Sequence, residues 1–84
     1  MNRTKRIENI LKKNFLNFRI KIIDNSYLHK GHNNFDGQDE THILIELKKP
    51  TNLKVNRLDV HKKINSLLIK EFESGLHSLQ INII

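Results

Sequence analysis

Apolar residues recur along the chain with two different spacings, which alternate in blocks. The first block has the spacing of a helix over residues 5–15, with Thr4 as its expected N-cap. Its apolar stripe consists of Ile7, Ile10, Leu11 and Phe15. Alternation then begins, with Phe18, Ile20 and Ile22 separated by basic residues. The pattern predicts a helix followed by a strand that ends near Asp24.

Residues 25–41 lack either spacing and are rich in Asn, Gly, Asp and His. This composition predicts a long loop, and long loops within compact domains are usually functional or disordered. Alternation resumes at residues 42–48, where Ile43, Ile45 and Leu47 share one face. The simplest pairing of these two successive strands is antiparallel.

Pro50 ends the second strand, because proline cannot donate to a sheet ladder. A second helix is predicted over residues 56–72, with Gly75 suited to the left-handed position just past its end. Its expected buried stripe is Val60, Ile64, Leu67, Leu68 and Phe72. A third strand follows, in which Leu79, Ile81 and Ile83 alternate with polar residues. We therefore expect one α+β domain over residues 1–84, ordered α-β-β-α-β, with both helices packed on one face of a three-stranded sheet.

The net charge of +6 favours acidic partners, including nucleic acid. One interpretation of this charge is a basic strip along one side of the domain, but helix-turn-helix geometry and a Gly-x-x-Gly loop are both absent from the sequence. Because Asn, Lys and Ile are abundant throughout, a solvated lysine-rich exterior is the preferred interpretation. The candidate nucleic-acid contacts are Lys48, Lys49, Lys54, Arg57, His61, Lys62 and Lys63.

The chain contains no cysteine, so disulfides and thiolate ligands of its own are excluded. It has no apolar run of the ~18 residues that a membrane span requires, and its basic start lacks the apolar segment of a secretory signal. The cytoplasm is therefore the expected location. We expect no enzymatic activity, because no nucleophile elbow or phosphate-binding glycine loop is present.

The five histidines are the main candidates for chemistry. His29 and His32 lie in the loop that leaves the first strand, and His42 lies where that loop enters the second. His77 stands between the helix stop and the third strand, where the sheet is expected to open towards solvent. One interpretation is a partial metal site that uses neutral imidazoles. The alternative, which spacing alone favours, is a set of exposed histidines without a shared ligand.

Several segments of the chain stand out, namely Ile-Ile-Asp-Asn-Ser (22–26), Leu-His-Lys-Gly-His (28–32), Glu-Thr-His (40–42), His-Lys-Lys-Ile-Asn (61–65) and Gly-Leu-His-Ser-Leu (75–79). Together they resemble the BolA-like family, in the same order and over nearly the whole chain. The departures are Val60, where the family commonly has arginine, and residues 52–54, where it has Phe-x-Gly. These departures affect any docking role of that arginine or glycine.

The resemblance implies a class II KH-like fold and a non-enzymatic adaptor in iron–sulfur cluster assembly or transfer. The implied partner is a monothiol glutaredoxin, which contributes its cysteine and a glutathione thiolate to a bridging 2Fe–2S cluster. On this chain it implies His77 as one ligand and His29, His32 or His42 as the second. No cofactor is expected on the isolated chain, and apoproteins are expected as clients. The alternative that the family offers is a DNA-binding transcriptional regulator.

Histidine ligation with sulfur from a partner suits a chain that has no thiol. Replacing thiolate by imidazole removes negative charge and raises a cluster's reduction potential. Because only neutral imidazole binds a metal, the resemblance implies cluster loss as the pH falls through about 6.5, the ordinary histidine pKa.

Overall fold

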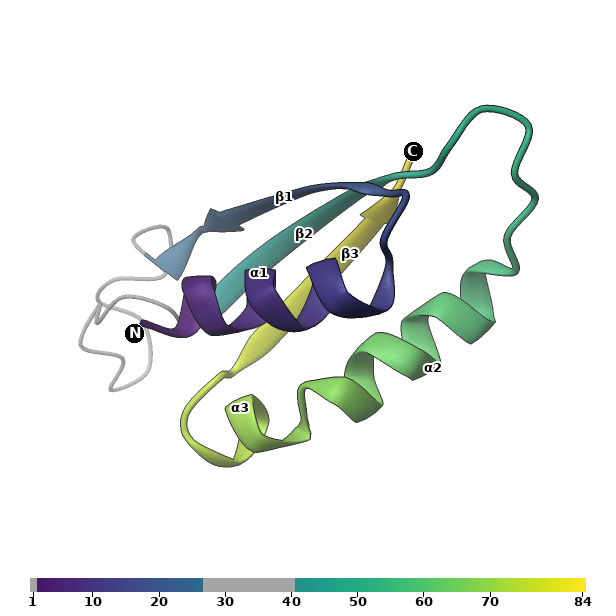
Figure 1. The fold of residues 1–84 in the computed structure, drawn as a ribbon. Coiled ribbons are helices and arrows are strands. Elements are labelled where there is room, and N and C mark those ends of the chain that lie inside the picture. The colour runs from purple at the N-terminus through teal and green to yellow at the C-terminus, as the bar shows by residue number, and fades with distance from the viewer. Residues whose placement is uncertain (1, 27–40) are drawn as a thin grey trace.

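The computed structural model describes residues 2–26 and 41–84, and it has the α+β architecture that the sequence predicts (Figure 1). The strands lie in the order β1-β2-β3, with β1 antiparallel and β3 parallel to β2. The elements are α1 (Arg3–Asn14), β1 (Arg19–Asp24), β2 (His42–Lys48), α2 (Arg57–Leu67), α3 (Ile69–Glu73) and β3 (Ser78–Ile83).

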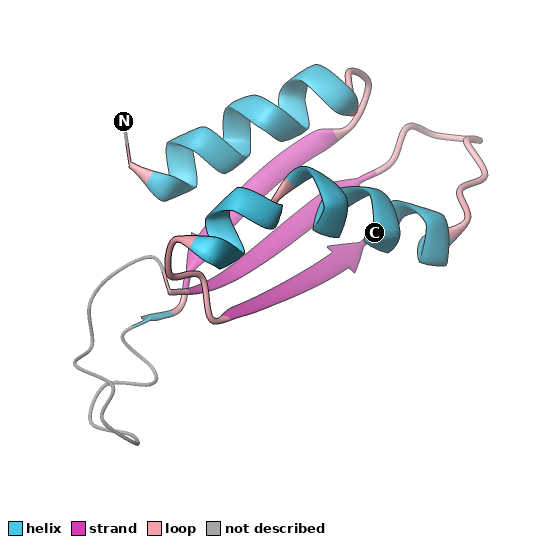
Figure 2. Ribbon diagram, turned by 90° about the horizontal axis from the view of Figure 1, so that it is seen from below, coloured by secondary structure: helices cyan, strands magenta, loops and turns pink. Residues whose placement is uncertain are grey.

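The helices lie on one face of the sheet and enclose a single apolar layer with it (Figure 2). Strand register places Ile45 between Ile22 of β1 and Ile81 of β3, so the three side chains form a row across the covered face. Ile7 and Leu11 of α1 are buried in the same cluster. The expected packing of the helices on one face is therefore confirmed.

Helix α1 begins two residues earlier than the sequence pattern suggests. Its N-cap is Asn2, whose side chain accepts a hydrogen bond of 2.9 Å from the backbone N–H of Lys5. The prediction of Thr4 as the cap is wrong, because Thr4 lies inside the first turn and its hydroxyl donates to the Asn2 side chain. Asparagine and threonine both cap helices well, so composition alone does not distinguish them.

The second predicted helix is interrupted at Leu68, which has non-helical angles (φ −104°, ψ 14°). After the interruption, Glu71 is buried and Phe72 is 36% exposed. The assignment of Phe72 to the buried stripe was therefore wrong. The remaining stripe residues behave as expected: Val60, Ile64 and Leu68 are buried, and Leu67 packs against them.

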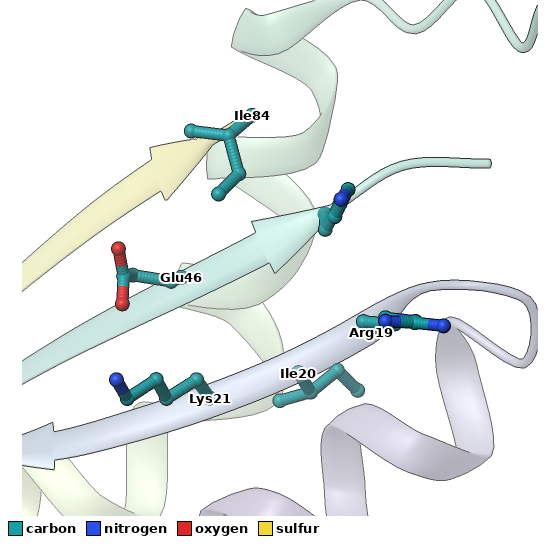
Figure 3. A pocket seen from close by; sticks show the side chains of 6 residues that line it. Arg19, Ile20, Lys21, Glu46 and Ile84 are labelled. Atoms are coloured by element: carbon teal, nitrogen blue, oxygen red, sulfur yellow. The ribbon is translucent and has the colours of Figure 1, made fainter. Parts of the chain in front are cut away.

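The other face of the sheet carries mostly polar and charged side chains. At the end of β2, a small open pocket is lined by residues of β1 and β2 together with Ile84 (Figure 3). Lys21 of β1 stands directly across from Glu46 of β2. The two faces thus differ sharply in character, as the alternation in each strand requires.

Candidate functional site: a histidine pair where two parallel strands begin

Two of the five histidines meet at one edge of the sheet. The ring centroids of His42 and His77 are 5.9 Å apart, and the ring planes are tilted by 42°. His42 opens β2 and His77 directly precedes β3. Because these strands are parallel, their first residues lie at the same edge, and His42 is in register with Ser78. Topology therefore brings together two side chains that are remote in sequence.

The backbone holds His77 firmly on both sides. Gly75 has a φ of +124°, which turns the chain from α3 towards the sheet. Leu76 is buried, and its N–H donates to the carbonyl of Glu71 over 2.9 Å. The N–H of His77 donates to the carbonyl of Thr41 over 2.8 Å, whereas its side chain is exposed. The predicted position of His77, at a corner open to solvent, is confirmed.

A buried carboxylate fixes the helical side of this corner. Glu71 accepts hydrogen bonds from Arg3 (Nε, 2.9 Å) and from Arg6 (Nε and a terminal nitrogen, each 2.9 Å). Arg3 also donates to the carbonyl and the hydroxyl of Ser74, at 2.9 and 3.1 Å. Hydrogen bonding from Arg6 lowers the pKa of Glu71, and burial opposes this effect. Hydrogen bonding from Arg3 also lowers the pKa. The arginines of α1 therefore tie that helix to the corner before His77.

A second set of hydrogen bonds surrounds His42. Ser26 is fully buried, and its hydroxyl lies 2.5 Å from a carboxylate oxygen of Asp24. The backbone N–H groups of Thr41 and His42 donate to the Ser26 hydroxyl oxygen, at 2.9 and 3.3 Å. The Thr41 hydroxyl lies 3.0 Å from Nδ1 of His42. Sequence reasoning did not identify Ser26 or Thr41 as contributors, although Asp-x-Ser just after a strand is a known turn-forming pattern.

The spacing of the two imidazoles suits two nitrogen ligands of one metal ion. A metal–nitrogen bond of about 2 Å places a ring centroid about 3 Å from the metal, so two rings on one tetrahedral centre lie roughly 5 Å apart. The observed 5.9 Å is close to this value. Within residues 2–26 and 41–84, no three His, Asp or Glu side chains gather into a metal site. The pair thus fits a share of a metal's coordination, to be completed by other donors.

The other histidine candidates are not part of this pair. His29 and His32 lie outside the described residues. His61 is half-buried on α2, among the residues of the proposed basic strip. Only His42 and His77 are therefore brought together in the part of the chain that the structure describes.

The basic strip lies towards the opposite end of β2, around the connection from β2 to α2 (Figure 1). The ammonium groups of Lys49 and Lys63 interact with other groups of the same chain. Lys49 donates to the carbonyl of Leu53 over 3.1 Å, and the Lys63 ammonium lies 5.1 Å from the centroid of the Phe15 ring. The remaining members are Lys48, Lys54, Arg57, His61 and Lys62, of which all but His61 are exposed. The strip and the histidine pair are thus separate surfaces.

No helix in the described ranges is long and apolar enough to cross a membrane.

Comparison with known proteins identifies the family. The family model described as BolA-like protein matches residues 2–84. The chain is 34% identical over 82 residues to an uncharacterized protein from the cobS 5′ region of a Sinorhizobium species, covering 96% of this chain and 88% of that one. It is 33% identical over 84 residues to the UV-induced protein uvi31 of Schizosaccharomyces pombe, covering 96% and 82%. The solved structure of BolA1 from Arabidopsis thaliana superposes with a TM-score of 0.79 at 30% identity, covering 99% of this chain and 90% of that one. The chain therefore belongs to the BolA-like family.

Proposed function

We propose that this protein is a non-enzymatic adaptor in iron–sulfur cluster assembly or transfer. It binds a monothiol glutaredoxin and shares a 2Fe–2S cluster with it as cargo. The observation that carries the proposal is the pair formed by His42 and His77, whose ring centroids are 5.9 Å apart at an accessible edge of the sheet.

The division of ligands follows from the composition of the chain. With no cysteine, this protein offers no thiolate donor, and in the proposal the sulfur donors come from the glutaredoxin cysteine and from glutathione. His77 is the first ligand in the proposal. His42 is the second, because among the described residues it is the imidazole beside His77. His29 and His32 are retained as competing second ligands, and the experiment below tests them in the same way.

Assembly of the heterocomplex tests the proposal directly. The protein is mixed with a monothiol glutaredoxin, iron, sulfide and glutathione, and circular dichroism is recorded in the visible range. We expect His77→Ala and His42→Ala each to alter the cluster spectrum and to weaken cluster retention. His61→Ala is the matched control, because His61 lies on α2 away from the pair, and it should resemble the wild type.

Two results would count against the assignment of ligands. If His77→Ala gives the wild-type spectrum, the assignment of His77 as a ligand is wrong. If His42→Ala gives the wild-type spectrum and His29→Ala or His32→Ala alters it, the second ligand is that loop histidine and not His42.

DNA binding is the alternative function, and the charge of +6 is the observation in its favour. It is the weaker proposal, since Lys49 and Lys63 of the basic strip are engaged within the chain. Binding to a DNA duplex should then weaken steeply with added salt, because neutralised phosphates release counterions. An absence of duplex binding at about 50 mM salt would remove this alternative.

A further inference from the structure

The face of the sheet that the helices leave uncovered carries a cluster of basic side chains at the end of β2. The pocket at this point has a volume of about 140 Å³ and is open to solvent (Figure 3). Arg19 and Lys21 of β1 and Lys48 of β2 line it, and all three side chains are exposed. Glu46 contributes a carboxylate to the same lining. The pocket is therefore accessible and rich in positive charge.

Strand register distributes these charges unevenly. Lys21 stands directly across from Glu46, which has the opposite charge, whereas Arg19 stands directly across from Lys48. Like charges that face each other on one side of an antiparallel pair are destabilising. In the described part of the chain, neither Arg19 nor Lys48 forms an ion pair with a carboxylate. A bound anion between these two side chains would remove their repulsion.

The charge of the pocket matches that of a phosphate monoester. Its lining has three basic side chains and one carboxylate, which leaves two positive charges uncompensated. A phosphate monoester carries a charge of about −1.5 to −2 at pH 7 and offers three acceptor oxygens. The planar guanidinium of Arg19 is suited to bind two of these oxygens, and the Lys48 ammonium acts as a point charge. A carboxylate ligand would neutralise only half of the excess charge.

An apolar side chain borders the basic residues. Ile84 follows β3, is 61% exposed and lines the same pocket. Backbone hydrogen bonds fix its position: its N–H donates to the carbonyl of Leu47 over 2.8 Å, and its carbonyl accepts from the N–H of Lys49 over 3.0 Å. Ile84 is therefore held beside Lys48, where it can contact an organic group attached to the phosphate.

We propose that this pocket binds the phosphate group of a small phosphorylated organic molecule, with Arg19 and Lys48 as its main contacts. The proposal does not depend on cluster binding, because the pocket lies at the opposite end of β2 from the histidine pair. It also differs from the basic strip, since Arg19 and Lys21 belong to β1. Nucleic acid offers phosphate as well, but as singly charged diesters, so the test separates the two sources.

Titration of the full-length chain with phenyl phosphate, followed by amide NMR at pH 8 and low salt, tests the proposal. Arg19→Gln and Lys48→Gln should each weaken binding by about threefold or more, as expected for contacts between exposed charges. Glu46→Gln should strengthen binding, because it removes a negative charge from the pocket. The matched control is Lys70→Gln, which removes one exposed positive charge from α3 and should bind as the wild type does. Urea denaturation checks that each variant is folded.

Comparison of ligands then tests the chemistry of the site. Benzoate has the same ring with a single charge, and it should bind more weakly than phenyl phosphate. An absence of binding at about 10 mM phenyl phosphate would overturn the proposal. Equal weakening by Lys70→Gln and Arg19→Gln would also overturn it, since net charge alone would then attract the ligand. If a short single-stranded DNA shifts the signals of this pocket equally with and without a 5′-phosphate, the ligand is nucleic acid and the small-molecule proposal is wrong.

Discussion

The apolar layer beneath the helices and the polar groups around the histidine pair stabilise the protein by different means. We call the second region the junction; it comprises Arg3, Arg6 and Glu71 on the helical side and Asp24, Ser26 and Thr41 on the strand side. In the layer, Leu11, Ile45 and Ile64 are fully buried and make non-directional contacts. At the junction, Ser26 and Glu71 are buried with their hydrogen-bonding groups partnered, and they are the buried polar residues of the described ranges. Ser26 is hydrogen-bonded to the backbone of His42, and Glu71 to the backbone of Leu76, the residue before His77. Burial of apolar area stabilises the fold, whereas directional polar contacts determine how individual groups are oriented.

The apolar layer should give the largest loss of stability. Ile45→Ala removes a side chain that is fully buried in the middle of the sheet, and it should lower the free energy of unfolding by about 2–5 kcal/mol. Ile69→Ala is the matched control at a site 54% exposed, with an expected change below about 0.5 kcal/mol. Urea denaturation measures both. Equal losses from the two variants would contradict the location of the core.

Glu71→Gln should be nearly as damaging, although it removes no apolar contact. It leaves the Arg3 side chain, only 11% exposed, beside a neutral amide. We expect a loss of about 3 kcal/mol, at the lower end for a broken buried ion pair because Arg6 is 41% exposed. Glu73→Gln alters an exposed carboxylate on the same helix and should have little effect. A difference of less than about 0.5 kcal/mol between the variants would show that the junction contributes no stability of its own.

Gly75→Ala should cost less, about 1–3 kcal/mol, because L-residues rarely adopt its φ of +124°. The added Cβ would lie 3.5 Å from the guanidinium of Arg3, an ordinary contact, so backbone strain is the main cause. Asn52→Gly is the control: it introduces a glycine at a residue whose φ is already 68°, so it should not destabilise the protein appreciably. Thermal unfolding compares the pair, and a neutral Gly75→Ala would contradict the strained corner.

Acid should weaken the junction gradually. The folded state lowers the pKa of Glu71 from its ordinary value of 4.5. Its carboxylate therefore contributes stability above that value, and the contribution is lost as the pH falls through the lower folded pKa. Between pH 5 and 3, the urea midpoint should fall further for the wild type than for Glu71→Gln. Parallel curves would mean that Glu71 does not take up its proton differently in the two states.

Local pattern was enough to predict the strands, because alternation depends only on which face is buried. The second strand was predicted at residues 42–48 and lies at His42–Lys48. The break at Leu68 and the ion pairs of Glu71 with Arg3 and Arg6 were not predictable in this way, because local spacing encodes neither a local change of backbone angles nor a contact between distant elements. A clue to Glu71 was nevertheless present: it follows Leu68 by three residues and Ile64 by seven, in phase with the buried stripe.

The candidate site was only partly visible in the sequence. The exposed corner position of His77 follows from Gly75 and from the alternation after it. The proximity of His42 to His77 does not follow from the sequence pattern, because this proximity depends on β3 running parallel to β2. The contacts of Ser26 with Thr41 and His42 join the end of β1 to the start of β2 across the intervening loop, and no local spacing encodes them.

The parallel pairing of β2 and β3 also has a consequence for the order of events during synthesis. His42 leaves the ribosome well before His77, yet the two rings adjoin only when β3 has docked beside β2. A nascent or partly folded chain therefore carries both imidazoles without offering them together. For the proposed ligation by both rings, the completed sheet would therefore be required.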